Sequence, residues 1–166
     1  DKAVRRILSL KFQMGLFDDP FVDEKQAVQL VASSEHTGLA REVARQSIVL
    51  LKNKDKLLPL KKDIRTLAVI GPNADNVYNM LGDYTAPQAD GTVVTVLDGI
   101  RQKVSKETRV LYAKGCAVRD SSRTGFKDAI ETARNADAVV MVMGGSSARD
   151  FSSEYEETGA AKVTIN

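Results

Sequence analysis

Short, mostly apolar segments that alternate with amphipathic helices constrain the fold of this chain more than any other feature. The segments are 48–51, 66–70, 109–113 and 138–143. Strands that are apolar on both faces are typical of parallel sheets covered by helices on both sides. From about residue 34 onward, the sequence therefore predicts an α/β fold with a mostly parallel sheet sandwiched between helices.

The expected helices are indicated by apolar residues at spacings of three and four. Three of them fill the first third of the chain, over 1–14, about 23–32 and 35–47, with a break at Asp18-Asp19-Pro20. Thr92 or Thr95 is a candidate cap for a later helix, and Thr124 for another. Their predicted inward faces are Val96, Leu97, Ile100 and Val104 in the first, and Phe126, Ala129, Ile130 and Ala133 in the second.

The composition excludes several classes of protein. Lys and Arg number 24 against 22 Asp and Glu, without long like-charge blocks, so no nucleic-acid footprint is visible. The single Cys116 and single His36 argue against a disulfide, a Cys/His metal site and a Ser-His-Asp triad. The longest apolar run, 138–143, is far shorter than the roughly 20 residues that cross a bilayer. We therefore expect no metal site, no nucleic-acid partner and no membrane span.

Two loops follow predicted strands and carry residues suited to chemistry. The loop 71–76 has the glycine, proline and amide side chains of a sharp turn, whose backbone N–H groups would face outward toward a ligand. The alternative interpretation is a turn that only caps the next helix. The loop 144–157 begins with two glycines and hydroxyls, but its spacing matches no phosphate-binding fingerprint. It also holds four carboxylates, Asp150, Glu154, Glu156 and Glu157. These form either a solvated acidic loop or, beside Phe151 and Tyr155, a carboxyl with its pKa raised into the general-acid range.

Five segments in order resemble glycoside hydrolase family 3, the β-glucosidases and β-xylosidases. They are GLFDDPFVD at 15–23, ARQSIVLLKN at 44–53, LLPL at 57–60, VIGPNAD at 69–75 and LGDY at 81–84. Each segment alone is a weak signal, but the ordered set is specific, and the resemblance runs from residue 1 to about 150.

The resemblance implies a two-domain enzyme, a (β/α)8-type barrel followed by a six-stranded α/β sandwich, with the sugar in the cleft between them. Residues 1–33 would then be the last helix of an absent barrel plus the interdomain linker, and residues 34–166 an incomplete sandwich domain. Both ends of the chain are interpreted as cut from a longer protein. Helix 1–14 should then expose Ile7, Leu8 and Phe12, or bury them in a crystal or dimer contact, because its partner would be the barrel.

The resemblance also implies a retaining, exo-acting β-glycosidase that removes sugars from the non-reducing end of β-linked oligosaccharides without a cofactor. The family's nucleophile is a barrel aspartate in a Ser-Asp-Trp type motif, and this chain contains no Trp, so the isolated chain is expected to be inactive. The acid/base would come from the loop after 138–143. The sequence departs there from the common Gly-Glu-Gly pattern, which leaves Glu154, Glu156, Glu157 or an acid beyond Asn166 open.

Among these acids we favour Glu154, because Tyr155 beside it would lower the local dielectric. β-Glucosidase is the first expectation and β-xylosidase the alternative. An alternative of a different class is a free-standing flavodoxin-like binding module, which leaves residues 1–33 unexplained. The family suggests a periplasmic or secreted location.

Overall fold

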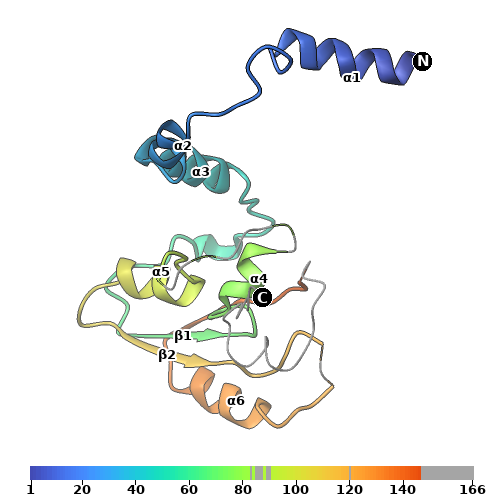
Figure 1. Ribbon diagram of the computed structural model, residues 1–166. Coiled ribbons are helices and arrows are strands. Elements are labelled where there is room, and N and C mark those ends of the chain that lie inside the picture. The colour runs from blue at the N-terminus through green and yellow to red at the C-terminus, as the bar shows by residue number, and fades with distance from the viewer. Residues whose placement is uncertain (83, 85–87, 89–90, 120, 147–166) are drawn as a thin grey trace. The chain divides into compact units, whose positions relative to one another are not determined.

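The structure is a computed structural model that describes residues 1–82, 84, 88, 91–119 and 121–146. The chain divides into two compact units, Asp1–Lys56 and Leu57–Asn166. The first unit contains α1 (Lys2–Gln13), α2 (Glu24–Leu30), α3 (Ser34–Gln46) and a short 3-10 turn, η1 (Lys54–Lys56) (Figure 1). The predicted domain boundary between residues 33 and 34 stays a prediction.

The helices of the first unit begin at residues that cap them. The Asp23 carboxylate accepts hydrogen bonds from the backbone N–H groups of Lys25 and Gln26, at 2.9 and 3.1 Å, at the start of α2. The Ser33 hydroxyl accepts one from the N–H of His36, at 3.3 Å, at the start of α3. These bonds satisfy donors that have no partner within the helix. The three helices predicted for the first third are confirmed.

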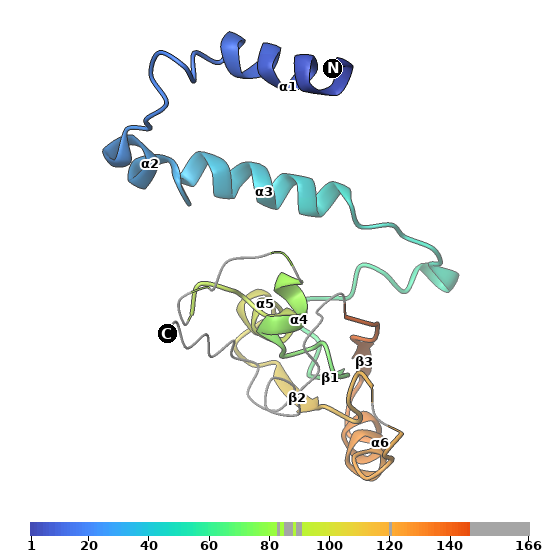
Figure 2. The ribbon, with the colours of Figure 1, turned by 45° about the vertical axis from the view of Figure 1, so that its right-hand side comes forward.

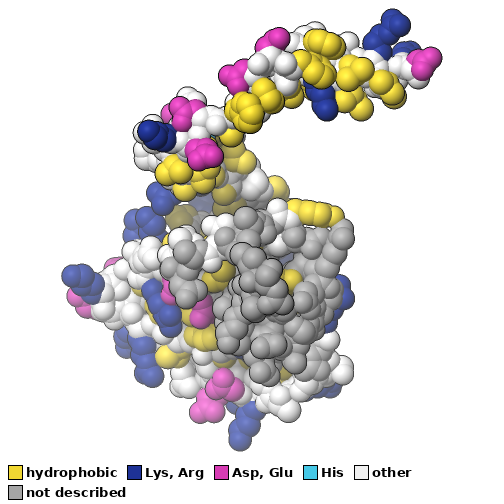
Figure 3. Space-filling model, in the orientation of Figure 1, with side chains coloured by type: hydrophobic (Ala, Val, Ile, Leu, Met, Phe, Trp, Pro, Cys, Tyr) yellow, Lys and Arg dark blue, Asp and Glu magenta, His cyan; other side chains and the backbone are white. Residues whose placement is uncertain are grey.

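Helix α1 carries an apolar stripe that remains exposed. None of its residues is buried, and Phe12 is 66% exposed. The rings of Phe12 and Phe17 stack on each other with their centroids 4.3 Å apart. Apolar side chains follow one another along this helix in Figure 3. The prediction that Ile7, Leu8 and Phe12 are exposed is confirmed.

The second unit is built on a three-stranded parallel sheet. Strand β1 (Thr66–Ile70) lies between β2 (Arg109–Ala113) and β3 (Ala138–Met141). Thr66 pairs with Arg109 on one side, and Leu67 pairs with Ala138 on the other. Helices α4 (Val77–Leu81), α5 (Val96–Lys103) and α6 (Phe126–Arg134) complete the unit.

Helices cover both faces of this sheet, with α4 and α5 on one side and α6 on the other (Figure 2). On the α5 face, Val69, Ala74 and Leu97 form a buried cluster. On the α6 face, Ala68, Ile70 and Ala113 pack against alanines of α6 and the turn after it. Successive residues of β1 thus serve opposite cores, which explains why this strand is apolar throughout. The predicted fold class is confirmed.

One predicted strand is wrong. Residues 48–51 form no strand, and all four side chains are exposed, Leu51 by 92%. An apolar run indicates that a segment is buried somewhere in the protein, but periodicity does not say against what. In the part of the chain that the structure describes, this run has no strand beside it.

The prediction for α6 is also corrected in two respects. The N-cap is Gly125 rather than Thr124, and position 125 requires glycine because a Cβ there would lie 2.5 Å from the backbone oxygen of Gly115. Ala129 and Ala133 pack inward as predicted, whereas Phe126 and Ile130 are about half exposed. These two larger side chains instead line an apolar pocket of about 240 Å³ with Met141 and Met143. The last predicted strand ends at Met141 rather than Met143.

Candidate functional site at the carboxyl end of the sheet

The three strands are parallel, so the loops that follow them start at the same edge of the sheet. Backbone hydrogen bonds hold these starting points together. The Gly71 N–H donates to Ala113 O at 3.1 Å, and the Val142 N–H donates to Ile70 O at 2.7 Å. In open parallel sheets this edge is where ligands usually bind.

The loop after β1 is a rigid turn. Gly71, Pro72, Ala74 and Asn76 are buried. The Asn76 side chain accepts a hydrogen bond from the N–H of Asn79 at 2.9 Å and so caps α4. The Leu97 N–H donates to Ala74 O at 2.9 Å, which ties the turn to the start of α5. The interpretation of 71–76 as a helix-capping turn is confirmed.

An amide pair joins this turn to the loop after β3. The Asn73 Nδ2 group donates to Gly145 O at 3.4 Å, and the Asn79 Nδ2 group donates to Asn73 Oδ1 at 2.9 Å. Sequence reasoning singled out the turn and the glycine pair but missed Asn79. The signal was there, since Asn73, Asn76 and Asn79 recur every third residue.

The loop after β3 is described only as far as Ser146. The predicted acid residues Glu154, Glu156 and Glu157, together with Asp150, lie outside the described residues. The structure therefore neither brings them together nor separates them, and their role stays a prediction. The two glycines that begin their loop are exposed at the sheet edge.

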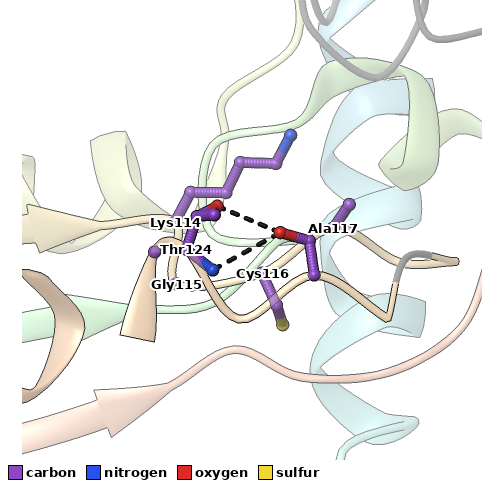
Figure 4. A pocket seen from close by; sticks show the side chains of 7 residues that line it. Lys114, Gly115, Cys116, Ala117 and Thr124 are labelled. Carbon is purple, nitrogen blue, oxygen red and sulfur yellow. Dashed lines mark hydrogen bonds between the residues drawn. The ribbon is translucent and has the colours of Figure 1, made fainter. Parts of the chain in front are cut away.

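The loop after β2 borders a pocket of about 210 Å³ (Figure 4). Its lining consists of Lys114, Gly115, Cys116, Ala117, Ser122, Thr124 and Gly125. The Thr124 N–H donates to the Ser122 hydroxyl, and the two hydroxyl oxygens lie 3.1 Å apart. The side chains of Lys114 and Cys116 point in opposite directions, so the ammonium group does not face the thiol (Figure 4).

The electrostatics of this edge perturb one tyrosine. Burial raises the pKa of the Tyr112 phenol, and the negative charge of Asp75 raises it further. Tyr112 lies on β2 and Asp75 in the turn after β1, so the effect links neighbouring strands. The Tyr112 phenol is therefore neutral at ordinary pH.

The described part of the chain has neither a metal-binding cluster nor a membrane-spanning helix. No group of three or more His, Cys, Asp or Glu side chains there could hold a metal ion. No described helix is long and apolar enough to cross a membrane.

Comparison with known proteins gives concordant matches. Residues 48–164 match the model of the glycosyl hydrolase family 3 C-terminal domain. A beta-xylosidase of Formosa agariphila is 42% identical over 88% of this chain and 21% of its own length. A periplasmic beta-glucosidase of Salmonella typhimurium is 35% identical over 99% of this chain and 24% of its own length.

A solved structure agrees with these matches. It belongs to a beta-glucosidase involved in saponin metabolism from intestinal bacteria, and it matches this structure with a TM-score of 0.74 and 32% sequence identity. The match covers 89% of this chain and 24% of that protein's chain. The chain thus spans about a fifth to a quarter of the length of these relatives.

Proposed function

The chain belongs to glycosyl hydrolase family 3, and we propose that the full-length protein is a retaining, exo-acting β-glycosidase. Its first substrate class is β-linked glucosides, cut one sugar at a time from the non-reducing end. The observation that carries this proposal is the family match over 48–164 together with similarity to a beta-glucosidase along nearly the whole chain. Family membership speaks against the alternative of a free-standing flavodoxin-like module.

A retaining glycosidase needs two carboxyl groups about 5 to 5.5 Å apart across the scissile bond. In this proposal the nucleophile is an aspartate of the upstream barrel domain. The second carboxyl comes from the segment that follows β3 and protonates the leaving oxygen. Support comes from the position of that segment, which starts at the carboxyl end of a parallel strand.

The acid/base has to hold a proton in the first step and accept one from water in the second. A carboxyl does this best when its pKa is raised toward the working pH. Glu154 is our choice because Tyr155 follows it and would exclude water from one side. Glu156 and Glu157 are the alternatives.

The test uses the full-length enzyme and compares leaving groups. Proton donation matters most for an alkyl or sugar alcohol and little for an activated phenol. Glu154→Ala should slow cleavage of a disaccharide by about 10² to 10⁴-fold. A nitrophenyl glycoside should be affected far less in the first step, and azide should accelerate the slowed second step by attacking the intermediate without base assistance.

Glu156→Ala and Glu157→Ala are the matched controls, because a neighbouring carboxylate can affect activity through the pKa or order of the loop alone. If Glu154→Ala slows both substrates equally and azide has no effect, Glu154 is not the acid/base. If none of the three variants depends on the leaving group, the acid/base lies outside this segment.

The second candidate substrate class is β-linked xylosides, favoured by the 42% identity to a beta-xylosidase. Glucose differs from xylose by its exocyclic hydroxymethyl group, which a xyloside-binding site has to exclude. Comparing kcat/KM for nitrophenyl β-glucoside and β-xyloside decides between them. If kcat/KM for the glucoside is lower than kcat/KM for the xyloside, the enzyme is a β-xylosidase rather than a β-glucosidase.

Two further parts of the proposal concern the activity of the isolated chain and the location of the full-length enzyme. The isolated chain 1–166 should hydrolyse neither nitrophenyl substrate, because the nucleophile is on the barrel. The full-length enzyme should be exported, as the name of the Salmonella relative suggests for that protein. Cell fractionation tests this, and recovery of all activity with the cytoplasmic fraction would contradict it.

A further inference from the structure

Two turns at the amino end of the sheet bring together positive charges that lie far apart in the sequence. The turns are residues 61–65, which precede β1, and residues 101–109, which run from the last turn of α5 to the first residue of β2. We call these two turns the basic edge, because they contain seven Lys and Arg side chains and only two carboxylates, Asp63 and Glu107. Outside the basic edge, the chain has more Asp and Glu than Lys and Arg, so its net positive charge comes from these turns.

Backbone hydrogen bonds join the two turns of the basic edge. The Ser105 N–H donates to Lys62 O at 2.8 Å, and the Arg109 N–H donates to Arg65 O at 2.9 Å. Figure 3 shows Lys and Arg side chains on the left of the second unit, on the side where β1 and β2 begin in Figure 1. The basic side chains therefore extend from one connected frame rather than from two independent loops.

Most of these charges have no ion-pair partner among the described residues. All seven side chains are exposed. Arg65 pairs with Asp137 at 3.6 Å, and Arg101 pairs with Asp98 at 3.5 Å. The five that form no ion pair with the described residues are Lys61, Lys62, Lys103, Lys106 and Arg109. Of these five, only Lys103 lies in the last turn of a helix, where a cation offsets the helix dipole, so the other four have no such structural role.

The composition of the basic edge favours a hydrated polyanion as its partner. Its only large apolar side chains, Ile64 and Val104, are partly buried, and neither turn contains an aromatic residue. Binding to a lipid surface or to single-stranded nucleic acid uses apolar or aromatic side chains that insert or stack. Lysine is a mobile point charge, which suits diffuse attraction to many anionic groups better than bidentate recognition of one.

We propose that the basic edge binds a carboxylated polysaccharide. Such a polymer presents negative charges in succession to cations of both turns, and cations held together raise the local potential above that of any single side chain. Strands β1 and β2 are each five residues long, so the basic edge lies roughly 16 Å from the carboxyl end of the sheet. Ligands of parallel sheets usually bind at that carboxyl end, which a polymer on the basic edge leaves open. The polysaccharide is therefore a tether for the protein and not the molecule that it cleaves.

The test measures the affinity of the full-length protein for immobilised polygalacturonate. Fully methyl-esterified polygalacturonate is the matched probe, because it has the same backbone without the charges. The protein should bind only the charged polymer, and the affinity should fall by at least about tenfold between about 50 and 200 mM salt, because salt screens the charges and competes with the cations. Equal affinity for both polymers, or no binding to either, overturns the inference.

Two variants with the same change in net charge locate the binding surface. The test variant is Lys61→Gln/Lys62→Gln/Lys106→Gln. The control removes three exposed lysines elsewhere in the chain and is Lys52→Gln/Lys54→Gln/Lys127→Gln. A lysine near a dense anionic surface is worth about fivefold in affinity, so the test variant should bind at least about tenfold more weakly, and the control should stay within about twofold of the wild type. If circular dichroism shows that the test variant is unfolded, Lys62→Gln and Lys106→Gln are measured singly, each with an expected loss of about fivefold.

Three other outcomes have a definite meaning. Equal weakening by the test variant and the control would show that only net charge matters, which contradicts the inference. Tighter binding to phosphatidylglycerol vesicles than to polygalacturonate would make a lipid surface the partner and would also contradict it. A wild type that binds polygalacturonate but hydrolyses no β-glycoside would refute the proposed function and leave this inference standing, because the basic edge lies at the opposite end of the sheet from the candidate site.

Discussion

Replacing Gly71 by alanine should strongly destabilise the second unit. Gly71 has φ +138°, in a region that side chains rarely adopt, and it directly follows β1. A Cβ there would lie 2.2 Å from the backbone oxygen of Val142 and 2.7 Å from its carbonyl carbon. Since both are backbone atoms, no rotation of a side chain can relieve the overlap.

The magnitude follows from four effects. The backbone conformation costs about 1 to 3 kcal/mol for a non-glycine residue. Moving the end of β3 away costs about 1 to 3 kcal/mol more and weakens the bond from the Val142 N–H to Ile70 O, worth about 1 kcal/mol. The lower entropy of an unfolded chain with alanine offsets about 0.4 to 1 kcal/mol. We expect a loss of about 3 to 5 kcal/mol, a large part of the 5 to 15 kcal/mol typical of a domain.

Gly91→Ala is the matched control, because Gly91 also has a positive φ, +79°, but nothing lies within 4 Å of its added Cβ. It should cost only about 1 to 2 kcal/mol. Denaturant unfolding of the two full-length variants measures the difference in free energy of unfolding, and hydrogen exchange at Val142 reports on the end of β3. Equal losses within about 0.5 kcal/mol would show that the contact between Gly71 and Val142 is not as described.

Three further predictions concern the same unit. Absorbance titration should give a Tyr112 pKa above the ordinary tyrosine value of 10.0, and Asp75→Asn should lower that pKa. The folded state should lose stability as the pH rises from 10 through the raised pKa, because the unfolded chain releases this proton first. In denaturant unfolding, Asp137→Ala should cost about 1 kcal/mol, because it removes the acceptor for the Thr66 N–H at 2.8 Å. Arg65→Ala breaks only the exposed 3.6 Å ion pair to Asp137 and should cost less than about 0.5 kcal/mol in the same assay. Leu97→Ala should cost about 2 to 5 kcal/mol in the same assay, since Leu97 is 1% exposed, and a smaller loss would contradict its place in the core.

The sequence predicted the core of the second unit well because its signals were local. Strands β1 and β2 have the predicted bounds, since each is a run of apolar residues between polar turns. Thr95 caps α5, accepting from the Asp98 N–H at 3.2 Å, as one of the two threonines considered. Its neighbour Leu97 enters the core as the helical spacing required.

The failures share a cause, which is that local patterns do not reveal what lies opposite. Thr124 was a good capping residue by type, but the close approach of Gly115 requires a glycine one position later. Phe126 and Ile130 have the correct helical spacing, yet alanines make the contacts to the sheet. The bond from Asn73 to Gly145 joins residues far apart in the sequence, and no spacing rule could indicate it.

Two long exposed apolar segments among the described residues belong to the first unit. They are the stripe on α1 and the run 48–51, whereas β1 in the second unit is almost entirely buried. Full burial of a side chain such as Ile7 or Phe12 is worth about 1.5 to 3 kcal/mol, so several left in water are a substantial unrealised stabilisation. Relatives of four to five times this length supply the surface that could provide it. In the proposed enzyme, packing of α1 within the upstream barrel domain would realise this stabilisation.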